Sequence, residues 1–195
     1  MVMLTLGILG SGAGSNMQAI LDAIAGGTLA ARIGIVLCDK PEALILERAR
    51  RQGIRAEVID CAGHRMKFTE EAQQETARKL NEAGVNMVCL AGFMRLVKRP
   101  LLDAFPDRIL NIHPSLLPAF PGLEAWRQAV EAGVSESGVT VHLVDAGMDT
   151  GQILGQEKVV VFADDTPETL HTRLQVAEHR LYPETIAGYA SRLNL

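Results

Sequence analysis

The sequence predicts a doubly wound α/β fold: a mostly parallel sheet with helices on both faces and one antiparallel strand. Short, continuous apolar runs alternate with longer stretches of helical periodicity, which is typical of parallel strands buried on both faces. A glycine-rich turn joins the first apolar run to the first helical stretch. No linker, internal repeat or low-complexity segment interrupts the 195 residues, so we expect a single domain, 1–195.

In the first half of the chain, expected strands and helices alternate. Apolar runs short enough to be buried strands lie at 4–9, 33–38, 57–59 and 86–90. Helical stretches lie at about 15–25, 41–50 and 69–83. The third of these begins after Thr69, a capping residue, and has Glu70 and Glu71 in its first turn, where acidic side chains favour the helix dipole.

The second half departs from this alternation. The expected elements are a helical turn at 101–105, a strand at 108–110, helices at about 123–132 and 166–190, and strands at 139–144 and 153–162. No helix separates the last two strands, so we expect them to pair antiparallel. Their connection, 145–151, is too long for a minimal hairpin.

The composition is that of an ordinary globular protein, with 48% hydrophobic and 22% charged residues. A net charge of −4 without any basic run argues against nucleic-acid binding, and no apolar run approaches the ~18 residues of a membrane span. The three cysteines lack metal-ligand spacing, so we expect no metal site. Since no secretory signal is present either, we expect a reduced, cytoplasmic protein.

The stretch Asn111-Ile112-His113-Pro114 follows the apolar run at 108–110. Residues two apart in an extended chain point the same way, about 6.5 Å from each other, so Asn111 and His113 project side by side. Pro114 disfavours helical backbone angles at His113. An amide donor beside a titratable imidazole can stabilise an oxyanion and move a proton. A polar strand end followed by a proline turn explains this stretch about equally well.

The turn Gly10-Ser11-Gly12-Ala13-Gly14-Ser15-Asn16 lies between a strand and a helix, where backbone N–H groups and the helix dipole favour a phosphate. Its spacing matches neither the G-x-G-x-x-G fingerprint nor the P-loop. A tight turn that needs glycine dihedrals explains it as well. A dinucleotide-binding module is an alternative, because Asp39 lies about 20–25 residues further on, where a ribose-binding acid is typical.

The loop 145–151 contains two acidic residues, Asp145 and Asp149. Either carboxylate could reach His113 and favour its cationic form, although most acidic residues in loops are solvated. The remaining histidines are interpreted without a chemical role. His142 lies within an expected strand and is interpreted as a satisfied core residue, while exposed or structural positions are assigned to His64, His171 and His179.

Several segments, spread nearly from end to end of the chain, share the pattern of one enzyme family. They are Ser11-Gly12-Ala13-Gly14-Ser15-Asn16, Leu90-Ala91-Gly92-Phe93-Met94-Arg95, Asn111-Ile112-His113-Pro114-Ser115-Leu116-Leu117-Pro118, Pro121-Gly122, His142, Met148-Asp149-Thr150-Gly151 and Gln175-Val176-Ala177-Glu178-His179. In these segments the sequence resembles the phosphoribosylglycinamide formyltransferases, folate-dependent enzymes of purine biosynthesis. Pro121-Gly122 favours these enzymes over the tRNA-directed and deformylase relatives.

The resemblance implies a formyltransferase-like, Rossmann-related fold and a set of residue roles. The implied catalytic residues are Asn111, His113 and Asp149. The implied binding residues for phosphoribosylglycinamide are Gly14, Ser15, Asn16, Gln175 and Glu178. Those for 10-formyltetrahydrofolate, the implied co-substrate, are Arg65, Met94, Arg95, Leu96, Val97, Asn111, Asp145, Ala146, Gly147, Met148 and Asp149. No metal is implied, the partners are small molecules, and the protein is expected to be a monomer or homodimer.

The implied reaction is direct formyl transfer from N10 of the folate to the amine of phosphoribosylglycinamide, through a tetrahedral intermediate, in de novo purine (IMP) biosynthesis. Asn111 and protonated His113 would stabilise the charge on the formyl oxygen. Asp149 would keep His113 charged and help to move a proton. A formyltetrahydrofolate hydrolase, or formyl transfer to another amine, is an alternative within the same chemistry.

Overall fold

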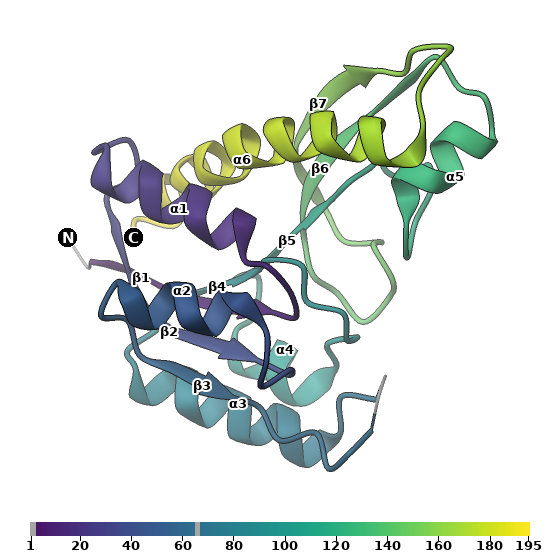
Figure 1. The fold of residues 1–195 in the computed structure, drawn as a ribbon. Coiled ribbons are helices and arrows are strands. Elements are labelled where there is room, and N and C mark those ends of the chain that lie inside the picture. Colours follow the sequence, from purple (N-terminus) through teal and green to yellow (C-terminus); the bar gives the residue numbers. More distant parts are fainter. Residues whose placement is uncertain (1–2, 65–66) are drawn as a thin grey trace.

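The structure, a computed structural model, describes residues 3–64 and 67–195 (Figure 1). In these ranges the chain forms one seven-stranded sheet in the order β3-β2-β1-β4-β5-β6-β7. The strands are β1 Leu4–Gly10, β2 Ala31–Cys38, β3 Ala56–Val58, β4 Met87–Leu90, β5 Ile109–His113, β6 Glu136–Leu143 and β7 Ile153–Val160. The helices are α1 Ser15–Ala25, α2 Leu44–Arg51, α3 Glu70–Glu82, α4 Arg99–Ala104, α5 Ala125–Glu131 and α6 Pro167–Arg192.

The predicted fold class is confirmed. Strands β1 to β5 pair parallel, and the β5–β6 and β6–β7 pairings are antiparallel, so β6 is the strand that runs against the others. The strand order reverses at β1, which lies between β2 and β4. Ligands of doubly wound sheets bind outside the carboxyl ends of the strands at such a switch point, which here is where the glycine-rich turn, the end of β4 and the end of β5 lie.

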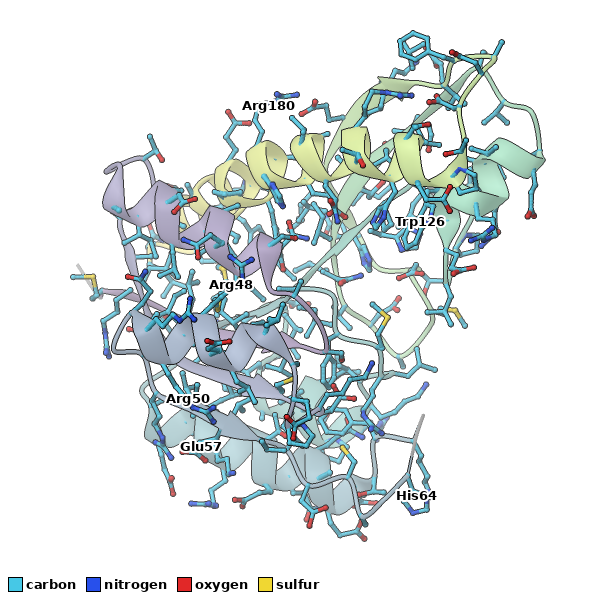
Figure 2. All side chains as sticks on the ribbon, viewed as in Figure 1. Arg48, Arg50, Glu57, His64, Trp126 and Arg180 are labelled. Atoms are coloured by element: carbon cyan, nitrogen blue, oxygen red, sulfur yellow. The ribbon has the colours of Figure 1, made fainter. Side chains whose placement is uncertain are left out.

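Helices cover both faces of the sheet, as Figure 1 shows. Apolar side chains of α1, α2 and α6 pack on one face, and those of α3 and α4 pack on the other. A third apolar cluster joins α5 and the first half of α6 to β6. There Trp126 of α5 lies against α6 (Figure 2), with its ring stacked on His171 at a centroid distance of 3.9 Å.

One buried phenol links helix α6 to the middle of the sheet. Tyr182 is fully buried, and its hydroxyl lies 2.9 Å from the Leu90 carbonyl oxygen and 3.0 Å from that of Leu110. Leu90 is the last residue of β4, and Leu110 lies on β5 directly before Asn111. The contact therefore fixes α6 against the two strands whose ends carry candidate site residues.

The expected helix at 41–50 starts three residues later than predicted, at Leu44. Residues 40–43 form a turn instead, in which the Ala43 N–H donates to the Lys40 carbonyl at 3.1 Å. The Ile45 N–H donates to the Gly12 carbonyl oxygen in the glycine-rich turn, also at 3.1 Å, so the start of α2 is fixed by a contact distant in sequence.

Within the described ranges, none of the helices has the length and apolar character needed to cross a bilayer.

Candidate active site

A cavity of about 270 Å³ opens beside the ends of β4 and β5. It brings together side chains from β5, β6, the loop after β4 and the loop between β6 and β7. Its lining includes Asn111, His113, His142 and Asp149, together with Gly92, Phe93, Met94, Arg95, Leu96, Val97, Leu123, Asp145, Gly147 and Met148. The expected catalytic residues thus lie around one space.

His113 is the last residue of β5, and its ring is engaged on both sides. Its Nε2 lies 2.9 Å from the Phe120 carbonyl oxygen. A carbonyl oxygen only accepts, so Nε2 carries the proton in the neutral ring and Nδ1 is left facing Asp149, whose Oδ2 is 3.5 Å away. A proton placed on Nδ1 would therefore lie between the imidazole and the carboxylate.

Asp149 is held between two imidazoles. Its Oδ2 accepts a hydrogen bond from the Gly122 N–H at 2.8 Å, and its Oδ1 lies 3.6 Å from His142 Nε2. Burial opposes ionisation of this carboxyl. The contacts with His142, the Gly122 N–H and His113 outweigh it, with the two rings attracting the carboxylate when they are protonated, so the pKa of Asp149 lies below its ordinary value. The carboxylate is ionised at neutral pH.

The sequence predicts a charged His113, and the burial of this residue argues against that expectation. The residue is 5% exposed, and burial, which disfavours the charged form of the imidazole, lowers the pKa of His113 below its ordinary value. The Phe120 carbonyl and Asp149 raise the pKa and His142 lowers it, but burial is the largest of these effects. The Asp149 carboxylate alone therefore does not keep His113 charged.

His142 belongs to this site, although the sequence interpretation placed it in the core. It is 2% exposed and hydrogen-bonded, as expected of a core residue. Its Nδ1 lies 2.7 Å from the Leu143 carbonyl oxygen, so Nδ1 carries the proton and Nε2 accepts from Asn111 Nδ2 at 3.1 Å. The antiparallel pairing of β5 with β6 places Asn111 opposite His142. The sequence pattern predicts the pairing of β6 with β7 only, and a predicted pairing of β6 with β5 would have identified His142 as a neighbour of Asn111.

The glycine-rich turn leads directly into α1. Gly14 has a φ of +76°, and a Cβ at this position would lie 2.8–3.0 Å from Ile45, so both the backbone angle and the packing require glycine. Ser15 and Asn16 are the first residues of α1, where N–H groups have no intrahelical acceptor. The turn thus has the geometry that favours an anion.

Asn16 and Glu178 connect this turn to α6. Asn16 Nδ2 donates to Glu178 Oε2 at 3.1 Å, and both residues are more than nine-tenths buried. Burial raises the pKa of Glu178 from its usual 4.5 to about 7, against the opposite effect of the Asn16 hydrogen bond. Gln175 lies half-buried one turn earlier on the same helix.

Glu178→Gln is expected to change how stability depends on pH. Between about pH 4.5 and 7, folded Glu178 keeps a proton that the unfolded chain releases, so this residue makes the protein less stable as pH rises. Glutamine cannot titrate, and one pKa unit is worth about 1.4 kcal/mol, so the variant should gain up to about 3 kcal/mol relative to wild type. Urea unfolding of both proteins at pH 5 and pH 8 measures the difference, and an equal difference at both pH values would contradict the raised pKa.

The folate-binding residues implied by the resemblance differ in exposure and in whether they line the cavity. Met94, Leu96 and Met148 expose 46%, 47% and 52% of their surface at the cavity. Val97 is buried in the wall, and Ala146, which does not line the cavity, accepts a hydrogen bond from Lys98 Nζ at 2.8 Å. Arg65 lies outside the described residues.

Arg95 contributes to the cavity wall, but its guanidinium points elsewhere. Arg95 Nε donates to Asp39 Oδ2 at 2.7 Å, and Nη1 donates to the carbonyls of His64 and Lys67. The Asp39 side chain is 2% exposed and its Oδ2 is paired with Arg95, so a ribose has no access to the carboxylate, and the alternative of a dinucleotide-binding module is not favoured. His64 itself is exposed, as expected, and its side chain lies at the edge of the molecule (Figure 2).

Comparisons of the sequence and of the structure with known proteins find relatives of the same family. The family model described as formyl transferase matches residues 5–186. Phosphoribosylglycinamide formyltransferase of Bacillus subtilis is 41% identical over 92% of this chain and 91% of that protein. The crystal structure of glycinamide ribonucleotide transformylase 1 from Symbiobacterium toebii superposes with a TM-score of 0.93, at 50% identity, over 97% of this chain and 88% of that one.

Some relatives are much longer. The trifunctional purine biosynthetic protein adenosine-3 of Drosophila pseudoobscura pseudoobscura is 45% identical over 94% of this chain, which spans only 14% of that protein. The same part of the sequence thus occurs both as nearly a whole protein and as a small share of a larger one.

Proposed function

The chain belongs to the formyl transferase family, and from this premise we propose that it transfers the formyl group of 10-formyltetrahydrofolate to the amine of phosphoribosylglycinamide, in purine biosynthesis. The observation that carries the proposal is the approach of Asp149 to His113, with 3.5 Å between Oδ2 and Nδ1, beside Asn111 in one cavity. An amide donor, an imidazole and an ionised carboxylate are the groups that acyl transfer between two nitrogens needs.

Asn111 is proposed to stabilise the negative charge that develops on the formyl oxygen. Its amide nitrogen has two N–H groups, and one is donated to His142. The contact fixes the amide so that the second N–H remains for the substrate. A donor held in place before the reaction needs no reorganisation as charge develops, which is why such donors contribute strongly to catalysis.

Asp149 and His113 are proposed to handle the proton. The attacking amine must lose a proton and the leaving N10 must gain one, and an ionised Asp149 can accept the first and return it, directly or through a water molecule. His113 Nδ1 faces this carboxylate. When the proton lies between them the imidazole becomes cationic and adds positive charge near the formyl oxygen.

The apolar rim of the cavity supports binding of the pterin of a formyl folate. Its rim exposes Met94, Leu96 and Met148, and flat aromatic ligands bind in clefts of this apolar kind. The loop that carries Asp145 and Asp149 lies on the same cavity and provides polar groups for the pterin ring. These residues would hold the co-substrate with its formyl group directed towards Asn111.

Titration of the protein with 10-formyltetrahydrofolate and phosphoribosylglycinamide, following loss of the formyl group by absorbance, tests the proposal. Formyl loss should require both compounds, and the formylated amine should appear in equal amount. Formyl loss at the same rate without phosphoribosylglycinamide would identify a hydrolase instead. No formyl loss with this amine, but turnover with another, would move the proposal to a different acceptor.

Replacing Ser15 and Asn16 together by alanine is expected mainly to raise the KM for phosphoribosylglycinamide. Both side chains lie at the start of α1, where the phosphate is proposed to bind, and Asn16 also contacts Glu178. The KM for 10-formyltetrahydrofolate should change little. Steady-state kinetics with each substrate varied in turn measures both constants, and an effect confined to the folate would show that the phosphate is bound elsewhere.

A further inference from the structure

A buried ion pair lies behind the wall of the folate cavity. The Asp39 and Arg95 side chains are 2% and 6% exposed, with 2.7 Å between Oδ2 and Nε. Asp39 directly follows β2, and Arg95 lies in the loop after β4. The pair therefore joins the ends of two strands that are not neighbours in the sheet, since β1 lies between them.

The Arg95 guanidinium also binds the chain between β3 and α3. Its Nη1 donates to the His64 carbonyl at 2.8 Å and to the Lys67 carbonyl at 2.7 Å. One side chain thus connects three segments, from Asp39, from His64 and Lys67, and from its own loop. Phe68 and Phe93 contact each other edge-to-face at 5.3 Å and add an apolar contact between the same two loops.

The loop after β4 is fixed at two further points. The Met94 N–H donates to Ser11 Oγ at 3.0 Å, and the Lys98 N–H donates to Gln73 Oε1 at 2.6 Å. Between these two hydrogen bonds lie Arg95, Leu96 and Val97, all of which line the cavity. Between the two hydrogen bonds, the buried ion pair of Arg95 with Asp39 connects the middle of this wall segment to the end of β2.

We propose that Asp39 is a positioning residue for the folate co-substrate: it holds Arg95 by a buried ion pair, and Arg95 in turn holds the cavity wall at residues 94–97. Loss of the carboxylate leaves a buried guanidinium without a counter-charge, which is costly. The guanidinium then moves towards water and shifts the wall. Asp39 itself does not line the cavity, so it acts through Arg95.

The inference rests on the proposed function and is tested by Asp39→Asn, which keeps the side-chain shape but removes the charge. The KM for 10-formyltetrahydrofolate should rise about tenfold, because small displacements of positioning groups are costly. The value of kcat and the KM for phosphoribosylglycinamide should stay within about twofold, because Asn111, His113 and the glycine-rich turn keep their own contacts. An unchanged folate KM would overturn the proposal.

Asp165→Asn is a matched control. Asp165 is 4% exposed in its side chain and pairs with Arg173 at the start of α6, and neither residue lines the cavity. This variant should lose stability with both KM values unchanged. If both variants change kcat and both KM values in parallel, Asp39 contributes only to general stability and the proposal is wrong.

A double-mutant cycle with Arg95→Gln tests whether Asp39 acts through Arg95. If the two residues act through one ion pair, the double variant should raise the folate KM no more than Arg95→Gln alone. If Asp39 acts independently of Arg95, the effects of the two substitutions on the folate KM should multiply, and the proposal is overturned. Absence of formyl transfer by the wild-type protein would instead refute the proposed function, and calorimetric titration of each variant with tetrahydrofolate would then test the positioning role without turnover.

Discussion

Asn111→Ala is expected to lower kcat by about 10²–10³ while the fold and the folate affinity change little. The variant removes the amide N–H that is proposed to bind the formyl oxygen as negative charge develops on it. Because this interaction strengthens only as the reaction proceeds, the loss falls on kcat rather than on KM. Single-turnover kinetics with both substrates saturating measures the chemical step directly.

Asn86→Ala is the control for this experiment. Asn86 also makes hydrogen bonds with its side chain, to the Thr5 N–H at 2.9 Å and the Met3 carbonyl at 3.0 Å, but it lies away from the cavity. Its replacement should lower stability without a comparable fall in kcat. Full turnover by Asn111→Ala would remove this residue from the mechanism.

Asp149→Asn is expected to lower kcat by about 10²–10⁴, the range typical of a lost general acid–base group. Asparagine can still accept the hydrogen bond from the Gly122 N–H, so the loop position is retained. What is lost is the negative charge 3.5 Å from His113 Nδ1. Asp149 raises the pKa of His113, so this pKa, already below the ordinary value, should fall further in the variant.

Steady-state kinetics and an NMR titration of the histidines measure these two effects. Asp60→Asn is a suitable control, because Asp60 Oδ1 likewise accepts a backbone hydrogen bond, from the Ala62 N–H at 2.8 Å, outside the cavity. It should leave both kcat and the His113 titration unchanged. An unaltered His113 pKa in Asp149→Asn would show that the carboxylate does not act on the imidazole.

The sequence predicts most of the fold because its signals are local. Continuous apolar runs specify buried parallel strands, and the missing helix between 139–144 and 153–162 predicts their antiparallel pairing, which the structure confirms. The side-by-side placement of Asn111 and His113 follows from the two-residue period of a strand. These features need no knowledge of which segments meet in space.

What the sequence could not provide depends on tertiary contacts. His142 joins the site only through the β5–β6 register. The Arg95 guanidinium binds Asp39 only because the sheet order places the ends of β2 and β4 on either side of β1. The lowered pKa of His113 results from burial, which no local pattern reveals. The start of α2 at Leu44 likewise follows from a contact with Gly12, more than thirty residues earlier.

Helix α6 follows every strand of the sheet along the chain, so during synthesis it leaves the ribosome after all of them. It carries both Tyr182, whose hydroxyl contacts β4 and β5, and Glu178, which meets Asn16 across 162 residues of sequence. Until α6 is made, the part of the sheet face beside α1 on which α6 packs stays uncovered. The proposed phosphate-binding end of the site becomes complete only when α6 packs against α1 and brings Glu178 to Asn16. Activity should therefore begin only after α6 has been translated.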